Sequence, residues 1–421
     1  MPSPLADSVK LPCGLVLQNR LSKAAMAEQI AVNNDADENL TAAYESWAKG
    51  GWGSIITGNV QVDVNHMGGP KDPALHGEYT GDTTILAQWK KYADTCQKHG
   101  TPAIVQINHP GRQSIRFAGR RGLFAPTLAP SAVPIYLGDG LIERAIATLA
   151  WSNPEEMSLT DIDRVIRQFV DTARLMADAG FSGVEFHAAH GFLMVLTSYL
   201  ADQFLSSKTN LRTDAYGGTP EKRVKFIIDI FHQTRAVVPA TFCIGIKLNS
   251  ADHSSETFEE TMSQIAILVS AGIDFLEISG GSYEDPQMMG YSVKEKSART
   301  VAREAFFLEF AKEVRERHPG LVLMLTGGFR SRAGAVSAIQ DGACDLVGLA
   351  RPAAVNPGFP HLLLDESVPD EEARLPLGLV PTPFLAKWLP KNLVGAGVES
   401  AFYAGQIQRM AKGLDTNAPG V

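Results

Sequence analysis

The sequence predicts an α/β fold, a closed (β/α)₈ barrel of the TIM type with an N-terminal β-hairpin, long loop insertions and a C-terminal extension. First, short apolar runs alternate with helical segments along most of the chain, and eight such runs can be counted. Second, crossovers of this length imply parallel strands, and eight of them favour closure over an open sheet. Third, several runs end in glycine or a polar residue, as expected if the active-site residues lie together at the carboxyl-terminal end of a barrel.

The first half of the chain begins with a hairpin over residues 8–18, turning at Pro12 and Gly14. Residues 21–27 form the first barrel strand. A helical pattern over residues 41–51 leads to a strand at 54–58, and a helix near 84–99 leads to a strand at 102–109. Residues 110–157 are rich in Gly, Pro and Arg, and we expect a long functional loop there without regular elements.

The alternation of helical segments and strands is clearer in the second half of the chain. A helical face that includes Ile162, Ile166 and Phe169 stops at Gly180, before the strand that carries two histidines. Thr219 is the expected N-cap of a helix with Pro220 at its first position. Thr257 and Glu260 have capping-box spacing before a helix that ends at Gly272. The remaining strands are expected at 242–248, 274–281, 321–326 and 345–349, with an irregular insert at 282–300 and helices at 303–314 and 331–340.

Residues 1–365 are expected to form the barrel, and residues 366–421 a C-terminal extension packed on it. Barrels of this class commonly run to about 250 residues or more as one unit. The extension is rich in Pro and Gly, with one helical segment at 400–412. We therefore predict no second domain.

Composition excludes several function classes. A net charge of -8 without a basic block argues against nucleic acid and anionic membrane as partners. Four separated cysteines without a C-x-x-C pair argue against an iron–sulfur cluster, a zinc site or a disulfide framework, and they fit a reducing compartment. The sequence shows neither a signal-peptide pattern nor an apolar run of ~20 residues, so we expect a cytoplasmic protein.

The expected carboxyl ends of the strands carry the candidate chemistry. Gly327 and Gly328 follow strand seven, and Ala350 and Arg351 follow strand eight, which is the usual phosphate position in barrels. The alternative is a pair of turn glycines and a surface arginine. His187 and His190 end another strand, where paired imidazoles could polarise a carbonyl oxygen, bind a metal or simply be buried. A metal is disfavoured because no third carboxylate or cysteine ligand accompanies them.

Two further strand-end residues offer complementary groups. Gln106 could pair with an imide edge through its donor and acceptor, and Lys247 could place positive charge near a developing anion. His109 also ends the strand of Gln106. For each residue taken alone, an ordinary polar rim position is the alternative.

The order of motifs along the chain resembles the Old Yellow Enzyme family of FMN-dependent ene reductases, in its fungal-type members, over roughly residues 8–365. The central motif is H-A-A-H-G followed by Y-L-A-D-Q-F-L-S-S-K-T-N-L-R-T-D-A-Y-G-G-T-P-E-K-R. Around it stand N-R-L-S-K-A-A-M, Q-I-N-H-P-G-R-Q, A-P-S-A, G-I-K-L-N, S-G-G-S-Y-E, R-E-A-F-F-L-E-F-A, T-G-G-F and L-V-G-L-A-R-P. So many motifs in order make a chance match improbable.

The resemblance implies non-covalent FMN, reduced by NAD(P)H and reoxidised by an activated alkene that binds in the same place. Hydride would pass to the β-carbon and a proton to the α-carbon. His187 and His190 would hold the substrate carbonyl. The implied flavin contacts are Ala24, Ala25, Met26, Ala27, Gly58, Gln106 and Lys247 at the ring, and Gly327, Gly328, Ala350 and Arg351 at the phosphate.

Four departures from the family pattern matter. Ala27 replaces a Thr or Cys that touches the flavin, Lys247 replaces Arg, and Ala350 replaces Gly, which is tolerable at negative φ. Phe192 stands where the family has its proton-donating tyrosine. An apparent seven-residue insertion could instead make Tyr199 that tyrosine, displaced by ~10 Å if the insertion is helical. The sequence leaves both registers open.

The resulting hypothesis is an FMN-dependent NAD(P)H ene reductase acting on enones, enals or maleimides, with no metal, as a monomer or homodimer. Its catalytic residues would be His187, His190 and Tyr199. Two alternatives stay open at this point. One is a flavin-binding protein with weak reductase or redox-neutral isomerase activity, motivated by Phe192 and Ala27. The other is a Schiff-base aldolase that uses Lys247.

Overall fold

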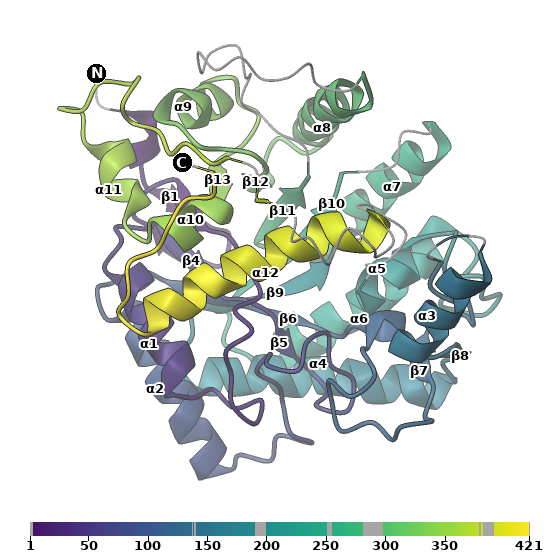
Figure 1. The fold of residues 1–421 in the computed structure, drawn as a ribbon. Coiled ribbons are helices and arrows are strands. Elements are labelled where there is room, and N and C mark those ends of the chain that lie inside the picture. The colour runs from purple at the N-terminus through teal and green to yellow at the C-terminus, as the bar shows by residue number, and fades with distance from the viewer. Residues whose placement is uncertain are drawn as a thin grey trace.

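A computed structural model describes residues 3–136, 138, 140–189, 199–250, 255–280, 298–378, 380–381 and 391–420. Within these residues, eight strands pair in parallel and close into a barrel, as predicted (Figure 1). The barrel strands are β3 (Leu21–Lys23), β4 (Ser54–Ile56), β6 (Ala103–Asn108), β9 (Gly183–Ala188), β10 (Cys243–Asn249), β11 (Phe275–Ser279), β12 (Leu323–Thr326) and β13 (Leu346–Leu349).

Helices surround this barrel on the outside (Figure 1). They form because apolar residues recur on one face, as in α4, where a capping box between Ser158 and Asp161 begins the helix and Ile162, Ile166 and Phe169 are buried. The helices are α1 (Glu38–Ala48), α2 (Thr83–Gln97), α4 (Leu159–Asp178), α5 (Leu200–Leu205), α6 (Pro220–Val237), α7 (Ser255–Ala271), α8 (Ala298–Arg317), α9 (Arg332–Gln340), α10 (Arg351–Val355) and α11 (Phe359–Leu364).

Alternation along each strand divides the barrel into two packing surfaces. On β9, Val184 and Phe186 belong to the main core that the helices share, whereas Glu185 and His187 fall on the opposite, inner face. A second apolar cluster fills the amino-terminal end of the interior, from Ile56, Ile104, Cys243, Phe275, Met324 and Leu346. Buried polar residues therefore gather toward the carboxyl ends of the strands.

The predicted N-terminal hairpin is present as β1 (Val9–Lys10) paired antiparallel with β2 (Val16–Leu17). Its Val9, Leu11 and Leu17 pack into the inner apolar cluster. The hairpin thus covers the amino-terminal end of the barrel, and the opposite mouth is left for chemistry.

The prediction of a structureless loop at 110–157 was wrong. This excursion contains the short helix η2 (Gly111–Gln113), β7 (Thr127–Ala129), α3 (Leu141–Trp151) and β8 (Pro154–Glu156), and β7 pairs in parallel with β8. The extra strand β5 (Val60–Gln61) extends the main sheet beside β6. Helix α3 was not predicted because no capping side chain marks its start: Gly140 stands at its N-cap, within a Gly- and Pro-rich segment.

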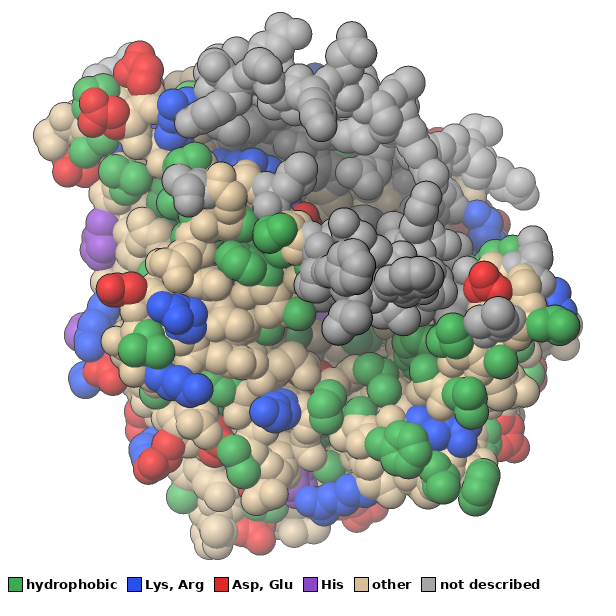
Figure 2. All heavy atoms as spheres, viewed as in Figure 1, with side chains coloured by type: hydrophobic (Ala, Val, Ile, Leu, Met, Phe, Trp, Pro, Cys, Tyr) green, Lys and Arg blue, Asp and Glu red, His purple; other side chains and the backbone are tan. Residues whose placement is uncertain are grey.

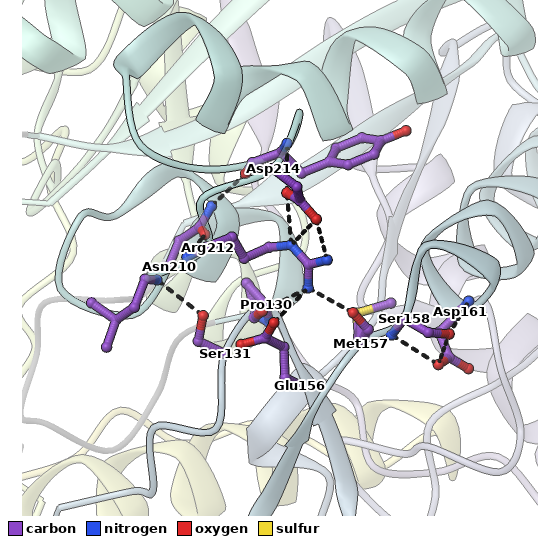
Figure 3. A network of polar contacts seen from close by, with 11 residues as sticks. Pro130, Ser131, Glu156, Met157, Ser158, Asp161, Asn210, Arg212 and Asp214 are labelled. Atoms are coloured by element: carbon purple, nitrogen blue, oxygen red, sulfur yellow. Dashed lines mark hydrogen bonds and ion pairs between the residues drawn. The ribbon is translucent and has the colours of Figure 1, made fainter.

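Arg212 fastens the middle and the carboxyl end of the excursion to the loop before α6 (Figure 3). Its buried guanidinium donates to the carbonyls of Pro130 at 3.0 Å and Met157 at 2.6 Å, and it pairs with Asp214 at 2.5 Å. Arginine suits this position because its planar fork offers several donors in fixed directions. The network makes the excursion a defined part of the fold.

The excursion also carries the most exposed large apolar side chains in the described chain. Phe124, Leu141, Phe117 and Leu149 are 88%, 84%, 78% and 69% exposed. Figure 2 shows hydrophobic side chains gathered at the lower right, on the side that α3 and β7 occupy in Figure 1. Clustered apolar exposure of this kind marks surfaces that contact other molecules.

Several helix boundaries differ from prediction. Pro220 begins α6 after Thr219, as expected. Thr257 does not cap α7, because that helix already begins at Ser255, and α8 begins at Ala298, inside the predicted irregular insert. The C-terminal helix α12 (Lys391–Ala411) is longer than predicted and packs against α1 and α10, burying Tyr403 and Ile407. None of the described helices is long and apolar enough to cross a membrane.

Candidate active site

The strand register brings the predicted ring-contact residues together at the carboxyl mouth. Gln106 on β6 is paired with Glu185 on β9, and His187 on β9 is paired with Lys247 on β10. Lys247 is in turn paired with Glu277 on β11. All five side chains lie on the inner face and are buried. Parallel pairing in a barrel therefore builds one continuous polar layer from four strands.

The predicted residues after β3 and β4 lie side by side. The amide of Ala24 donates to the carbonyl of Leu349, and Ala25, Met26 and Ala27 are partly exposed. A Cβ at Gly58 would meet the carbonyl oxygen of Met26 at 2.2 Å, so only glycine fits there. The two predicted groups of flavin contacts thus share one edge of the mouth.

A buried ionic cluster lies within the polar layer. The Lys247 ammonium is 2.7 Å from a Glu277 carboxyl oxygen, and the Gln106 amide donates to Glu185 at 2.5 Å. Burial, together with the charge of Glu277, raises the pKa of Glu185 well above its usual range. Burial opposes ionisation of Glu277 as well, but the Lys247 charge lowers the pKa of Glu277. Ionisation is therefore disfavoured at Glu185 and favoured at Glu277, the carboxyl group beside Lys247.

Protonation also satisfies the carboxyl oxygens. Apart from the ion pair, Oε1 of Glu185 and both oxygens of Glu277 have no hydrogen-bond partner within the described part of the chain. A proton on Glu185 supplies the missing donor between the two carboxyl groups. Glu277 consequently provides the one negative charge of this cluster that balances the Lys247 ammonium.

Other buried polar atoms near the same strand ends have no hydrogen-bond partner among the residues that the structure describes. They are both side-chain atoms of Asn108 and the Nδ2 of Asn249, each two residues beyond a predicted contact residue on its strand. A buried polar group without a partner costs about 1–3 kcal/mol. Together with Gln106 and Lys247, this mixed set of donors and acceptors fits the polar edge of the flavin ring that the sequence resemblance implies.

The predicted phosphate residues are also brought together. Pairing of Thr326 with Gly348 places Gly327 and Gly328 beside the segment that contains Ala350 and Arg351. Gly328 has a φ of 69°, a conformation that suits glycine. Ala350 has a φ of -95°, so the alanine is accommodated as the sequence required. Arg351 is partly exposed, and its Nη1 lies 3.5 Å from Glu399 of α12.

His187 and Tyr199 lie against each other, with ring centroids 4.2 Å apart. The Nδ1 of His187 accepts the Ala189 amide at 3.3 Å, so the neutral ring carries its hydrogen on Nε2 and can donate from there. Tyr199 immediately precedes α5. The proposed displacement by the insertion has not removed it from the His187 site. His190 and Phe192 fall outside the described residues.

Asn59 contacts the tyrosine, and sequence reasoning missed it. Its side-chain amide donates to the Tyr199 hydroxyl at 2.9 Å. Burial and the nearby Asp72 charge raise the pKa of Tyr199, while the Asn59 hydrogen bond lowers it. The preceding Gly58 amide is held by Glu28 and by the Tyr44 hydroxyl, each at 2.8 Å. These contacts fix the backbone from which Asn59 reaches the tyrosine.

The other missed residues had a recognisable signal. Polar residues two positions apart interrupt otherwise apolar strands, as in Gln106 and Asn108 or Glu185 and His187. This spacing places both side chains on one face of a strand. Asn59 had no such signal, because it follows β4 in a connection where spacing does not define a face.

One histidine cluster near the mouth resembles a metal centre in composition. Asp63, His66 and His109 present ligand-type atoms within 4.8 Å of one another. However, His66 Nδ1 is 2.8 Å from the Asp63 carboxylate, and His109 Nδ1 accepts the Gly111 amide at 3.0 Å. The neutral His109 ring must then carry hydrogen on Nε2, which leaves no lone pair for a metal. Local hydrogen bonds therefore engage His66 and the Nδ1 of His109, whereas His109 Nε2 has no partner among the described residues.

Comparison with known proteins identifies relatives over nearly the whole chain. Residues 13–369 match the sequence model of the NADH:flavin oxidoreductase / NADH oxidase family. The chain is 42% identical over 414 residues to the NADH-dependent flavin oxidoreductase iccE of Talaromyces variabilis, covering 97% of this chain and 98% of that protein. It is 44% identical over 383 residues to iliE, of the same description, from Hypocrea jecorina (strain QM6a), covering 90% and 94%. The fold is similar to that of morphinone reductase, with a TM-score of 0.68 at 21% identity over 86% of this chain and 90% of that chain.

Proposed function

The chain belongs to the NADH:flavin oxidoreductase / NADH oxidase family, which confirms the resemblance to Old Yellow Enzyme, and we propose that it is an FMN-dependent ene reductase. It takes hydride from NADH and reduces the activated C=C bond of an α,β-unsaturated carbonyl compound. The observation that carries the proposal is the contact of His187 with Tyr199 beside the polar layer of Gln106 and Lys247. This arrangement combines a carbonyl donor with a proton donor.

The proposed cofactor is FMN, which when bound supplies hydride transfer from NADH to the β-carbon of the alkene. Gln106 and Lys247 would hold the polar edge of its ring, with the Lys247 ammonium kept in place by its ion pair with Glu277. Ala24, Ala25, Met26, Ala27 and Gly58 line the ring, and Gly327, Gly328, Ala350 and Arg351 hold the phosphate. The orphaned polar atoms of Asn108 support a polar ligand at this place.

His187 is proposed to bind the substrate carbonyl. Its Nε2–H donor has a fixed orientation, because Nδ1 is engaged by the Ala189 amide. A hydrogen bond to the carbonyl oxygen strengthens as negative charge develops on that oxygen, so it lowers the barrier for attack at the β-carbon. His190, which the structure does not describe, is proposed as the second donor by its place in the motif.

Tyr199 is proposed to hold the proton that goes to the α-carbon. Its raised pKa keeps the phenol protonated across the physiological range, so a proton is available when the α-carbon becomes basic. Asn59 donates to the phenol oxygen rather than accepting from it, so the phenol hydrogen does not point at Asn59. Asn59 is therefore a positioning residue for the proton donor.

NADH is proposed as the reductant because two close relatives bear the description NADH-dependent. The substrate class is proposed as enones, enals or maleimides.

The aldolase alternative loses support from the geometry. A Schiff-base lysine must present a neutral amine, whereas the Lys247 ammonium is paired with a carboxylate at 2.7 Å within a fully buried layer. The redox-neutral isomerase alternative would use the same site and the same residues. It is distinguished from reduction by whether NADH is consumed with the substrate.

The test is the visible absorption spectrum of the purified protein under anaerobic conditions. A flavin spectrum that bleaches with NADH and recovers on addition of cyclohexenone, with one saturated ketone formed per NADH, supports the proposal. Bleaching without recovery by any activated alkene contradicts ene reduction and moves the isomerase forward. A colourless protein that FMN does not reconstitute contradicts the cofactor assignment, and borohydride trapping then tests Lys247.

A further inference from the structure

We propose that Cys13 and Cys243 are an oxidisable thiol pair, which a hydroperoxide converts to a disulfide that fastens the N-terminal hairpin to the barrel floor. Cys13 lies in the turn between β1 and β2. Cys243 is the first residue of β10 and belongs to the inner apolar cluster on which that hairpin packs. The pair therefore joins two elements that are far apart in sequence and meet in the apolar cluster at the amino-terminal end of the barrel.

The sulfur atoms of Cys13 and Cys243 already lie close together. The Sγ atoms of Cys13 and Cys243 and an Asp274 carboxyl oxygen all lie within 4.8 Å of one another. Since a disulfide has an S–S length of about 2.05 Å, the sulfurs need to approach by no more than ~3 Å. Side-chain rotation at the partly exposed Cys13 can supply most of this movement.

Asp274 holds the backbones on both sides in place and is not available as a metal ligand. One carboxyl oxygen accepts the Cys13 amide at 2.8 Å. The other accepts the Ile244 amide at 2.7 Å and the Arg235 guanidinium at 2.9 Å. Because both Asp274 oxygens already accept hydrogen bonds, we interpret the cluster as two thiols held in position by Asp274 and not as a cation site.

The two thiols differ in reactivity in the manner that disulfide formation needs. The Cys243 thiol hydrogen-bonds to the Cys13 sulfur and lowers the pKa of Cys13, although burial opposes this. Burial raises the pKa of Cys243 well above its usual range. Thiolate character and access decide which cysteine reacts with an oxidant first, so Cys13 is the nucleophile and Cys243 the resolving thiol.

The reaction is balanced with one hydroperoxide per disulfide. The Cys13 thiolate attacks the terminal peroxide oxygen, the O–O bond breaks, and water or an alcohol leaves while Cys13 becomes a sulfenic acid. Cys243 sulfur then attacks the Cys13 sulfur, the S–O bond breaks, and the Cys243 proton leaves with the hydroxide as water. Two thiols are oxidised and one peroxide is reduced, and a dithiol reductant reverses the change.

The experiment treats the full-length flavin-loaded protein with hydrogen peroxide, blocks remaining thiols with an alkylating reagent and maps disulfides by mass spectrometry. The expected product is one Cys13–Cys243 crosslink that dithiothreitol removes, with an unfolding temperature raised by roughly 5 °C. Cys344→Ser is the matched control, since Cys344 is buried with a raised pKa and lies outside the pair. It should form the crosslink as the wild type does.

Two single variants separate the roles. Cys13→Ser should abolish the crosslink and the rise in unfolding temperature. Cys243→Ser should leave Cys13 as a sulfenic acid that dimedone traps. Two results in the wild type would overturn the proposal. One is oxidation of Cys13 to the sulfinic acid while Cys243 still reacts with the alkylating reagent. The other is oxidation of Cys344 as fast as that of Cys13. These outcomes do not depend on ene reduction.

Discussion

Replacing Asn59 with aspartate reverses a single hydrogen bond at the proposed proton donor. In the native chain the Asn59 amide donates to the Tyr199 hydroxyl at 2.9 Å. Asn59→Asp keeps the shape of the side chain but presents only acceptor oxygens when ionised. The Tyr199 hydroxyl must then donate to the new carboxylate, so the hydrogen that the substrate needs is held in the wrong direction.

The expected slowdown follows from the strength of the new hydrogen bond. A bond from a hydroxyl to a charged acceptor contributes about 1.5–3 kcal/mol, and it must be broken before the proton can be transferred. At 1.4 kcal/mol for each factor of ten, protonation should slow roughly 10- to 150-fold. Asn59→Ala removes a neutral bond of about 0.5–1.5 kcal/mol and should cost only about 2- to 12-fold.

The assay follows the two half-reactions separately by stopped-flow absorbance. Flavin reduction by NADH does not use the Tyr199 proton, so Asn59→Asp should leave that rate within about twofold, whereas reoxidation by cyclohexenone should slow and show a larger solvent isotope effect. Tyr199→Phe sets the full contribution of the proton donor, about 10²–10⁴-fold for general acid catalysis. The double variant should be no slower than Tyr199→Phe, because Asn59 acts only through the tyrosine.

Equal slowing of both half-reactions in Asn59→Asp would refute this reasoning, because it would indicate damage to the flavin site. Additive effects in the double variant would also refute it, since Asn59 would then act independently. Unchanged reoxidation in Tyr199→Phe would show instead that another group donates the proton. Retained flavin and unfolding temperature serve as controls for folding.

Four other predictions test the rest of the site and its support. His187→Ala should weaken binding of a phenol, which mimics the charged oxygen, by roughly 10- to 150-fold, and an unchanged affinity in a flavin absorbance titration would exclude the role. Lys247→Met leaves buried carboxyls without a cation and should lower the unfolding free energy by about 3–5 kcal/mol in urea titrations, while Lys247→Arg should retain most of it. Burial raises the pKa of Asp72 to about 7, so the native state keeps a proton that the unfolded chain releases above pH ~4. Unfolding free energy should therefore fall by up to about 4 kcal/mol between pH ~4 and pH ~7, and Asp72→Asn should flatten this fall. Arg212→Met should lower the local opening free energy of the excursion by about 2–3 kcal/mol and speed its cleavage by trypsin roughly 30- to 150-fold, with little change in global unfolding.

The barrel could be predicted because its signals are local. Each strand is a short apolar run, and each helix has a buried stripe such as that of Ile162, Ile166 and Phe169. The carboxyl ends of parallel strands all lie at the same end of a barrel, so Gln106, His187 and Lys247 could be assigned to one site. Helix α3 was missed because its N-cap is Gly140, which gives no side-chain signal for the start of a helix in a Gly- and Pro-rich segment.

The contacts that decide the chemistry were beyond sequence because they depend on how separate elements dock. Whether Tyr199 reaches His187 is set by the path of the residues between them, and a register count along the chain does not fix that path. Asn59 reaches Tyr199 only because Gly58 is held by Glu28, a residue from a different connection. The sequence contains all of these side chains, but their meeting is a property of the closed barrel. Positions two apart on apolar strands are therefore the best sequence guide to such a site, and residues in the connections must be found from the structure.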